Sequence, residues 1–178
     1  MRRFMLVAGM GMALAAEAAS GGPPLLLAVV AARNAADTVR ELLAGGSATD
    51  ERDGHGMTAL MAASRAGATS AMAALLDAGA DPNLHDSRQW TPLMHAIHRR
   101  QSEAVRLLLE RGADPNARTE AGTPLMMAAG EADPVFVTLL LEHGADPRAR
   151  GWSGATAFSV AVSSSALANI DRLLLGVL

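Results

Sequence analysis

Two groups of side chains in this sequence are of types whose spacing could support chemistry. His95 and His98 lie three residues apart, which can place both imidazoles on one face of a helix. Two imidazoles so placed could begin a metal site, but a third ligand would have to come from another part of the chain. We favour the simpler interpretation that these histidines are satisfied or solvent-exposed.

The second group consists of three methionines. Met61, Met94 and Met126 recur at a nearly constant interval along the chain. Three aligned thioethers could bind a soft metal such as Cu(I), or could consume oxidants. The competing interpretation, which we favour, is that methionine fills gaps between closely packed helices. Solvent access decides between the two, because buried sulfur atoms cannot serve as a ready sink.

No catalytic or cofactor-binding motif is recognisable in the chain. It has no cysteine nucleophile, and its basic residues are all arginine, so a lysine-based phosphate loop is excluded. Neither a Gly-x-Ser-x-Gly nor a His-Glu-x-x-His motif is present. The sequence therefore predicts a protein that is not an enzyme and that uses no cofactor or metal.

A short sequence motif, here called a phrase, recurs along the chain and predicts the helices that carry these residues. The phrase begins with a threonine and has Leu or Phe at its third position, and its threonines are Thr58, Thr91, Thr123 and Thr156. A second phrase, Gly-Ala-Asp-Pro, follows three of these threonines at a constant offset, at Gly79, Gly112 and Gly144. The period of about 33 residues is typical of stacked-repeat proteins.

One repeat can be interpreted from its residues. Thr91 suits the N-cap of a helix and Pro92 its first position, where no amide donor is needed. A second helix is expected from about Ser102, with Gly112 just past its end. In the first repeat we expect Asp37 to cap the second helix. A short helix pair of this kind buries too little to fold alone, so repeats must stack.

The Thr-Pro-Leu-x-x-Ala phrase at this period resembles the ankyrin repeat. The resemblance implies an all-α ankyrin-repeat solenoid of about five stacked helix-turn-helix repeats with projecting β-turn loops. We divide the chain into repeats 25–57, 58–90, 91–122, 123–155 and 156–178. The three methionines stand where the family's phrase usually has histidine.

The N-terminal residues differ from the repeats. Arg2 and Arg3 precede an uncharged apolar run, and Ala16-Glu17-Ala18 fits a signal-peptidase site, as does Ala13-Leu14-Ala15. We predict a signal peptide over 1–19, a linker over 20–24, and a periplasmic or secreted protein. The alternative is an ordinary N-terminal cap helix. The run is too short for a confident membrane span, so stable membrane insertion is not expected after cleavage.

The charge of the chain argues against nucleic-acid binding. The full chain has a net charge of −3, and removal of residues 1–18 takes away two arginines and one glutamate, leaving about −4. A protein of this charge is expected to bind neither DNA nor RNA through its backbone phosphates.

The resemblance also implies a binding surface on the concave side, at the loops and the ends of the inner helices. Arginine and tryptophan are enriched in interface hot spots. The residues carried to this surface are Arg33, Arg65, Arg88, Trp90, His98, Arg99 and Trp152. We expect a partner protein with an acidic patch. The apolar C-terminal end, from Leu173 onward, is a candidate for self-association.

The sequence thus predicts a non-catalytic protein-interaction module, exported and acting as an accessory factor for an envelope enzyme or as a neutraliser of a toxin. One alternative is an oxidant or soft-metal buffer built on the three methionines. Another is a cytoplasmic scaffold, which requires that residues 1–18 stay attached.

Overall fold

The computed structural model describes residues 25–120, 122–131, 133–151 and 153–177. Over these residues the chain forms ten α-helices and no strand, which confirms the all-α prediction. The helices are α2 (Leu25–Ala32), α3 (Ala36–Ala44), α4 (Ala59–Ala66), α5 (Thr69–Asp77), α6 (Pro92–His98), α7 (Ser102–Glu110), α8 (Pro124–Gly130), α9 (Pro134–Glu142), α10 (Ala157–Ser163) and α11 (Leu167–Val177).

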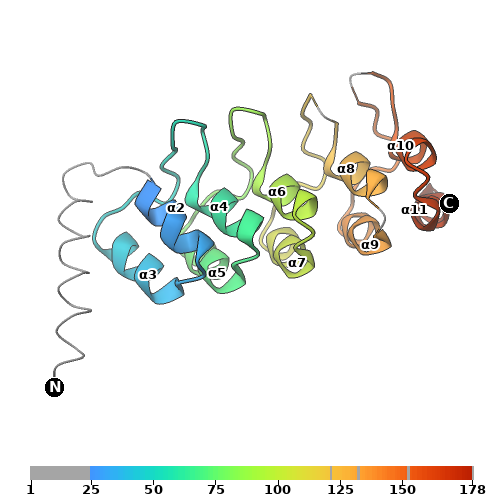
Figure 1. Cartoon of the computed structure of the whole chain (residues 1–178). Helices are drawn as coiled ribbons and strands as arrows, with labels where there is room; N and C mark the ends of the chain where they lie inside the picture. The colour runs from blue at the N-terminus through green and yellow to red at the C-terminus, as the bar shows by residue number, and fades with distance from the viewer. Residues whose placement is uncertain (1–24, 121, 132, 152, 178) are drawn as a thin grey trace.

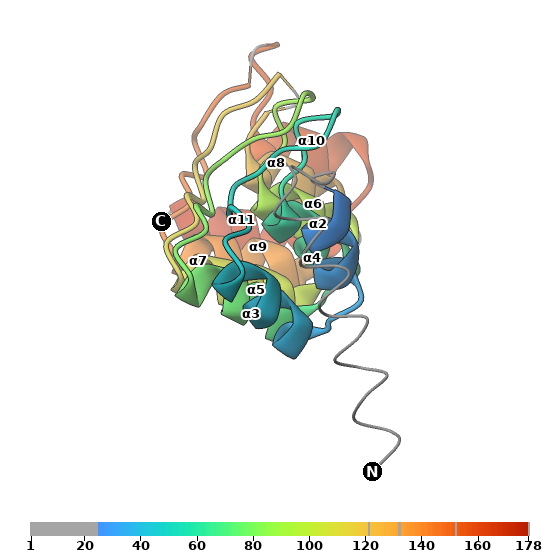
Figure 2. The same cartoon turned by 90° about the vertical axis from the view of Figure 1, so that its left-hand side faces the viewer.

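The helices are arranged as five antiparallel pairs in two rows (Figure 1). The inner row packs α2 on α4, α4 on α6, α6 on α8 and α8 on α10, and the outer row packs α3 through α11 in the same order. Loops project from the inner row on one side of the stack, as the turned view in Figure 2 also shows. This architecture is the predicted repeat solenoid.

Threonine caps explain where the inner helices begin. At each of α4, α6, α8 and α10 the threonine hydroxyl accepts a hydrogen bond from the backbone N–H three residues later, and the four caps are Thr58, Thr91, Thr123 and Thr156. Pro92 and Pro124 occupy the first turn, where a missing N–H costs nothing. The recurring phrase therefore sets the start of four inner helices.

The outer helix of the first repeat begins differently from the prediction. Helix α3 starts at Ala36 after Ala35, so Asp37 lies inside the first turn and is not its N-cap. The reason is the tight connection from α2, in which Asn34 takes a left-handed conformation with φ of 58°. Asp37 instead pairs with Arg40 at 2.8 Å, and its carboxylate still faces the positive end of the helix dipole.

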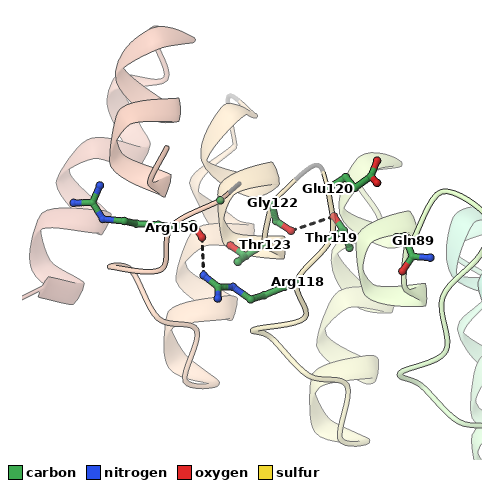
Figure 3. Close-up of a pocket in the computed structure, with 8 residues that line it drawn as sticks. Gln89, Arg118, Thr119, Glu120, Gly122, Thr123 and Arg150 are labelled. Carbon is green, nitrogen blue, oxygen red and sulfur yellow. Dashed lines mark hydrogen bonds between the residues drawn. The ribbon is translucent and has the colours of Figure 1, made fainter. Parts of the chain in front are cut away.

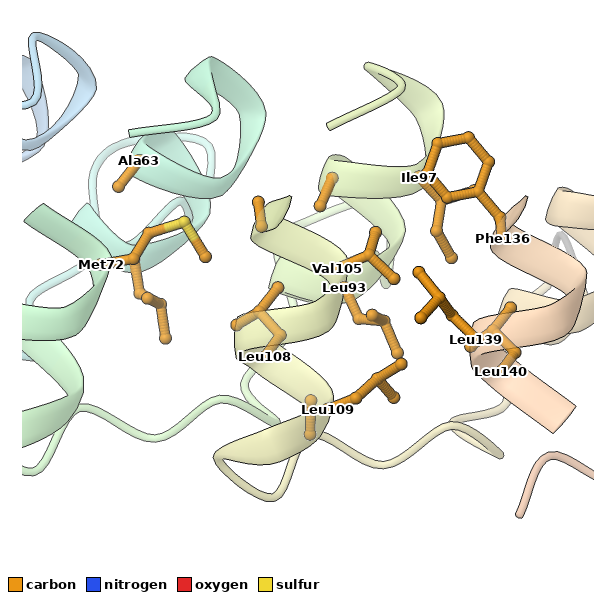
Figure 4. Close-up of a cluster of buried hydrophobic side chains, with 14 of the residues drawn as sticks. Ala63, Met72, Leu93, Ile97, Val105, Leu108, Leu109, Phe136, Leu139 and Leu140 are labelled. Carbon is orange, nitrogen blue, oxygen red and sulfur yellow. The ribbon is translucent and has the colours of Figure 1, made fainter. Parts of the chain in front are cut away.

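The core is a continuous layer between the two rows, filled by Leu, Ile, Val, Ala, Met and one Phe (Figure 4). Leu93, Ile97, Leu108, Phe136 and Leu140 are fully buried in it. Alanines at recurring inner-helix positions leave room for the next repeat to approach closely. One repeat has no such core alone, so the stability of the stack is shared between neighbours.

Hydrogen bonds between neighbouring loops hold the loop bases together. Asn83 accepts from the backbone N–H of Asp114 at 2.7 Å and donates to the carbonyl of Gly112 at 3.2 Å. Asn116 repeats the pattern one repeat later, accepting from Asp146 N–H at 2.8 Å and donating to the Gly144 carbonyl at 2.9 Å. This asparagine ladder of Asn83 and Asn116 fixes the base of each loop against the next.

The predicted signal peptide and linker, residues 1–24, lie outside the described residues, as does Trp152. Among the described helices, none has the length and apolar character needed to cross a membrane.

Candidate partner-binding surface

Two of the predicted arginines line one hollow on the inner-helix side. The hollow has a volume of about 600 Å³ and is lined by Ala32, Met57, Ala62, Arg65, Ala66, Arg99 and Gln101. Arg65 lies in the last turn of α4, and Arg99 immediately follows α6. Ala32 comes from α2, so three consecutive repeats build this Arg65–Arg99 hollow.

The chemistry of the hollow suits an anion carried on an apolar stem. Both arginines are exposed, and within the described part of the chain neither takes part in an ion pair. Apart from the two arginines and Gln101, the residues that line the hollow are three alanines and Met57. A carboxylate from a partner would meet two guanidinium groups there, each able to bind it through two donors.

Arg33, the equivalent of Arg99 in the first repeat, is exposed just after α2 but is not among the residues that line the hollow. Arg100, beside Arg99, forms an ion pair with Glu131 across the next repeat, at 2.8 Å from its Nη2. The structure thus separates Arg65 and Arg99, whose charges face solvent, from an arginine already paired within the fold.

Arg88, Trp90 and His98 form a second group, in which the structure brings the loop before α6 together with the last residue of that helix. The Trp90 ring meets the edge of His98 with ring centroids 5.1 Å apart, and the Arg88 guanidinium lies 5.9 Å from the Trp90 ring centroid. Trp90 is half-buried against His95 and His98 of α6, while Arg88 and His98 are exposed. The tryptophan therefore supports the two basic side chains and leaves them facing solvent.

A buried acid and base beneath this group were not predicted from the sequence. Asp86 and His95 are both buried, and His95 Nε2 lies 3.1 Å from Asp86 Oδ2. The other Asp86 oxygen, Oδ1, accepts from the backbone N–H groups of Arg88 at 2.8 Å and Trp90 at 2.9 Å. The Asp86 carboxylate therefore shapes the loop that presents Arg88 and Trp90.

A signal for this loop was present in the sequence. Asp53 occupies the equivalent position one repeat before Asp86 and makes the same pair of loop contacts, to the N–H groups of His55 at 2.8 Å and Met57 at 2.9 Å. The aspartate therefore recurs with the repeat. What spacing could not show is that His95, and not another residue, reaches the second carboxylate oxygen.

Burial sets the protonation of His95. Loss of solvation lowers the pKa of His95 below its ordinary value of 6.5, and the Asp86 carboxylate opposes that shift without reversing it. His95 and His98 both contact the Trp90 ring, but Asp86 already engages His95. Across the described ranges, no group of three or more His, Cys, Asp or Glu side chains is arranged to hold a metal ion.

A second hollow of about 480 Å³ lies between the projecting loops (Figure 3). Its lining residues are Gln89, Arg118, Thr119, Glu120, Gly122, Thr123, Arg150 and Gly151. Arg118 donates to the carbonyl of Arg150 at 2.6 Å, and Thr119 and Gly122 exchange backbone hydrogen bonds at 3.0 Å across a tight turn. Arg118, Arg150 and Glu120 thus place charges of both signs around this hollow.

The three aligned methionines are buried, with Met61 and Met94 0% exposed and Met126 4% exposed. The Met61 sulfur lies 3.5 Å from the Thr58 backbone nitrogen. The Met126 sulfur lies so close to Gly122 that a Cβ atom there would be only 2.7 Å away. Their burial agrees with the packing interpretation and leaves the sulfurs without ready access to solvent.

The comparisons with known proteins agree with this architecture. A family model described as "Ankyrin repeats (3 copies)" matches residues 25–119, more than half of the chain. A second, described as "Ankyrin repeat", matches residues 122–152. No curated protein matches the chain at a significant level. The helix pairs stack at the repeat period, and threonines cap the inner helices. Together with both family matches, these observations show that the chain belongs to the ankyrin-repeat family.

Proposed function

We propose that this protein binds a partner protein through the Arg65–Arg99 hollow and the neighbouring loops, and that it catalyses no reaction. Ankyrin repeats generally mediate protein–protein interaction and are typically not enzymes. The observation that carries the proposal is the pair of exposed arginines that line one hollow with apolar side chains, built by three consecutive repeats.

The partner is expected to present an acidic segment. An Asp or Glu side chain entering the hollow would place its carboxylate between the two guanidinium groups and its methylene groups against the alanines. Arg88 and His98, held by Trp90, extend the basic surface toward the loops. Charge of one sign on the binding face speeds the encounter with an oppositely charged partner and makes it sensitive to salt.

We further propose that the protein acts after export, in the periplasm or outside the cell. The support is the sequence of residues 1–19, in which two arginines precede an apolar run and a small-residue cleavage pattern. An exported binder would act as an accessory factor of an envelope enzyme or as a neutraliser of a toxin. Neutralisation predicts tight one-to-one binding, and harm to the cell when the gene is deleted while its partner remains.

The experiment is affinity capture from an envelope extract with C-terminally tagged protein, followed by identification of bound proteins. Arg65→Ala/Arg99→Ala is the test variant. Arg40→Ala/Arg106→Ala, on the outer helices α3 and α7, removes the same charge from exposed positions away from the hollow. We expect one stoichiometric partner with wild type and control, and at least a roughly tenfold loss with the test variant. Equal capture by both variants would refute the assignment of the hollow.

The same preparation tests the location. Mass spectrometry of the purified chain is expected to find an N-terminus at residue 19, or at residue 16 for the alternative site. An intact N-terminus in a cytoplasmic fraction would favour the scaffold alternative. The methionine-based buffer is the less favoured function, because the three sulfurs lie in the core.

A further inference from the structure

A row of basic side chains runs along the projecting loops. Its members stand at the same place in the loops before α4, α6, α8 and α10, six residues before the capping threonine (five in the loop before α8), and they are Arg52, His85, Arg118 and Arg150. All four side chains are exposed. This basic loop row shares no residue with the Arg65–Arg99 hollow.

Backbone carbonyls of neighbouring loops hold two arginines of the row in place. Arg52 Nη1 donates to the carbonyl of His85 at 3.0 Å, and Arg118 Nη2 donates to the carbonyl of Arg150 at 2.6 Å (Figure 3). Both bonds join one member of the row to the next. An arginine carries five N–H donors, so one such bond leaves several donors for a ligand. A side chain already held in one position loses less conformational freedom on binding.

The basic groups of the row are not paired with acids within the described part of the chain. None of the four takes part in an ion pair there. Two exposed acids stand nearby, since Glu51 precedes Arg52, and Glu120 lines the hollow of about 480 Å³ together with Arg118 and Arg150. Figure 3 shows the Glu120 carboxylate turned away from the Arg118 guanidinium. The row therefore offers one basic group at each loop to a negatively charged ligand.

The spacing of the row indicates the conformation of a ligand that could follow it. Inner helices of successive repeats pack directly on one another, and packed helices lie about 8–10 Å apart. A polyproline II segment has about three residues per turn and rises about 3.1 Å per residue, so every third side chain returns to one face about 9 Å further on. In a β-strand the side chains on one face are only about 7 Å apart. The interval of the row therefore matches a polyproline II segment better than a strand.

We propose that the basic loop row binds a segment of a partner protein that is extended in the polyproline II conformation and carries Asp or Glu at every third position. Each carboxylate would meet one member of the row through charge-assisted hydrogen bonds. The hollow that Arg118 and Arg150 line offers room for the residues between two acids. The proposal rests on the proposed function only in that the partner is a protein, because the row and the Arg65–Arg99 hollow are separate sets of residues.

Fluorescence anisotropy of labelled peptides with the full chain tests the proposal. The test peptide has four Glu-Pro-Pro units, because proline favours the polyproline II conformation. A control peptide of the same composition, with glutamate at every second position, is expected to bind at least roughly threefold more weakly. Arg118→Ala/Arg150→Ala is expected to weaken binding of the test peptide at least roughly tenfold, and Arg40→Ala/Arg106→Ala to leave it unchanged. Far-ultraviolet circular dichroism verifies that each variant is folded.

Three results would overturn the proposal. The first is equal affinity for the two peptides, or no binding of either, because spacing would then not be recognised. The second is an affinity for the test peptide that Arg118→Ala/Arg150→Ala leaves as in the wild type. The third is tighter binding of single-stranded DNA than of the test peptide, a ligand that the net charge of −3 disfavours. Partner capture with the Arg65 and Arg99 variant tests the proposed function separately, so either proposal can fail alone.

Discussion

At the scale of single residues, Asp86 combines more roles than any other described side chain near the proposed surface. Its carboxylate is buried, accepts two loop N–H groups and contacts His95. Asp86→Ala would leave these buried groups without a partner, so we expect the free energy of unfolding to fall by about 2–4 kcal/mol. Urea denaturation followed by circular dichroism measures this change.

Asp53→Ala is the matched control, because Asp53 makes the same two loop contacts without a histidine partner and in a more exposed setting. Its expected loss is about 1 kcal/mol. Equal losses in the two variants would show that the Asp86–His95 contact contributes nothing to stability.

His95 makes stability depend on pH in a defined direction. Its pKa is lowered in the folded protein, so below pH 6.5 the unfolded chain takes up a proton that the folded chain does not yet bind. The free energy of unfolding is therefore expected to fall as the pH drops below 6.5 toward the folded-state pKa, and to be largest above 6.5. Urea curves between about pH 5 and 8 measure the slope.

His95→Gln removes the titrating group and keeps a side chain that can bond to Asp86. The variant is expected to lose most of the slope over this pH range. A slope equal to that of the wild type would place the pH dependence elsewhere in the chain.

At the scale of elements, the connection between inner and outer helices is set by one left-handed residue in each of four repeats. These residues are Asn34, Gly67, Arg100 and Ser165, with φ between 57° and 69°. Three of them are not glycine, so the fold imposes this conformation on ordinary side chains. At Gly67 a side chain would also meet Gln101, because a Cβ atom there would approach its Oε1 closely.

Gly67→Ala is therefore expected to lower the free energy of unfolding by about 1–2 kcal/mol, from left-handed strain and the contact with Gln101. Thermal and urea denaturation measure the loss. Adding Gln101→Ala removes the contact and is expected to recover part of the loss, leaving the strain. Full recovery would show that the backbone conformation costs nothing, and no recovery that the contact is harmless.

The first residues of the helices show which structural features could be predicted from the sequence alone. The threonine phrase predicted four inner-helix starts because a cap and a first-turn proline act locally. Asp37 was misplaced because the start of α3 is set by the left-handed Asn34, and asparagine in that conformation leaves a weak sequence signal. Asp133, before a proline, accepts a hydrogen bond from the Val135 N–H and caps α9, which begins at Pro134.

The candidate site was predictable where it follows the repeat period. Arg65 and Arg99 both fall at the ends of inner helices, one residue out of register with each other, so the repeat period alone suggested that they lie near each other. The pairing of Arg100 with Glu131 and of Asp86 with His95 depends on side-chain reach between different loops and helices. The repeat period gives the positions of residues along the chain and does not show which side chains are long enough and oriented to meet.

At the scale of the whole molecule, a single buried amide links the fifth repeat to the fourth. Asn169 on α11 is fully buried, and its Nδ2 donates to the carbonyls of Ala129 and Glu131 at the end of α8, at 3.1 and 2.5 Å. Because each repeat of a solenoid contacts only its neighbours, loss of this link is expected to act locally.

Asn169→Ala is therefore expected to speed amide hydrogen exchange in α10 and α11 and to leave α4 to α7 unchanged. Exchange measured by mass spectrometry resolves these segments. Faster exchange throughout the chain would mean that the stack opens as one cooperative unit and not repeat by repeat.

The asparagine ladder has a consequence for how the loops can vary. The bonds that Asn83 and Asn116 make to the next loop go to backbone atoms, at Asp114, Gly112, Asp146 and Gly144. These bonds at the loop base do not depend on the side chains at the tip, whereas the bonds that Ser87 and Arg118 donate to the carbonyls of His55 and Arg150 do. Tip residues that make no such bond and no contact with a helix can therefore be replaced while the loop base stays attached, so new binding specificities could be grafted at those positions.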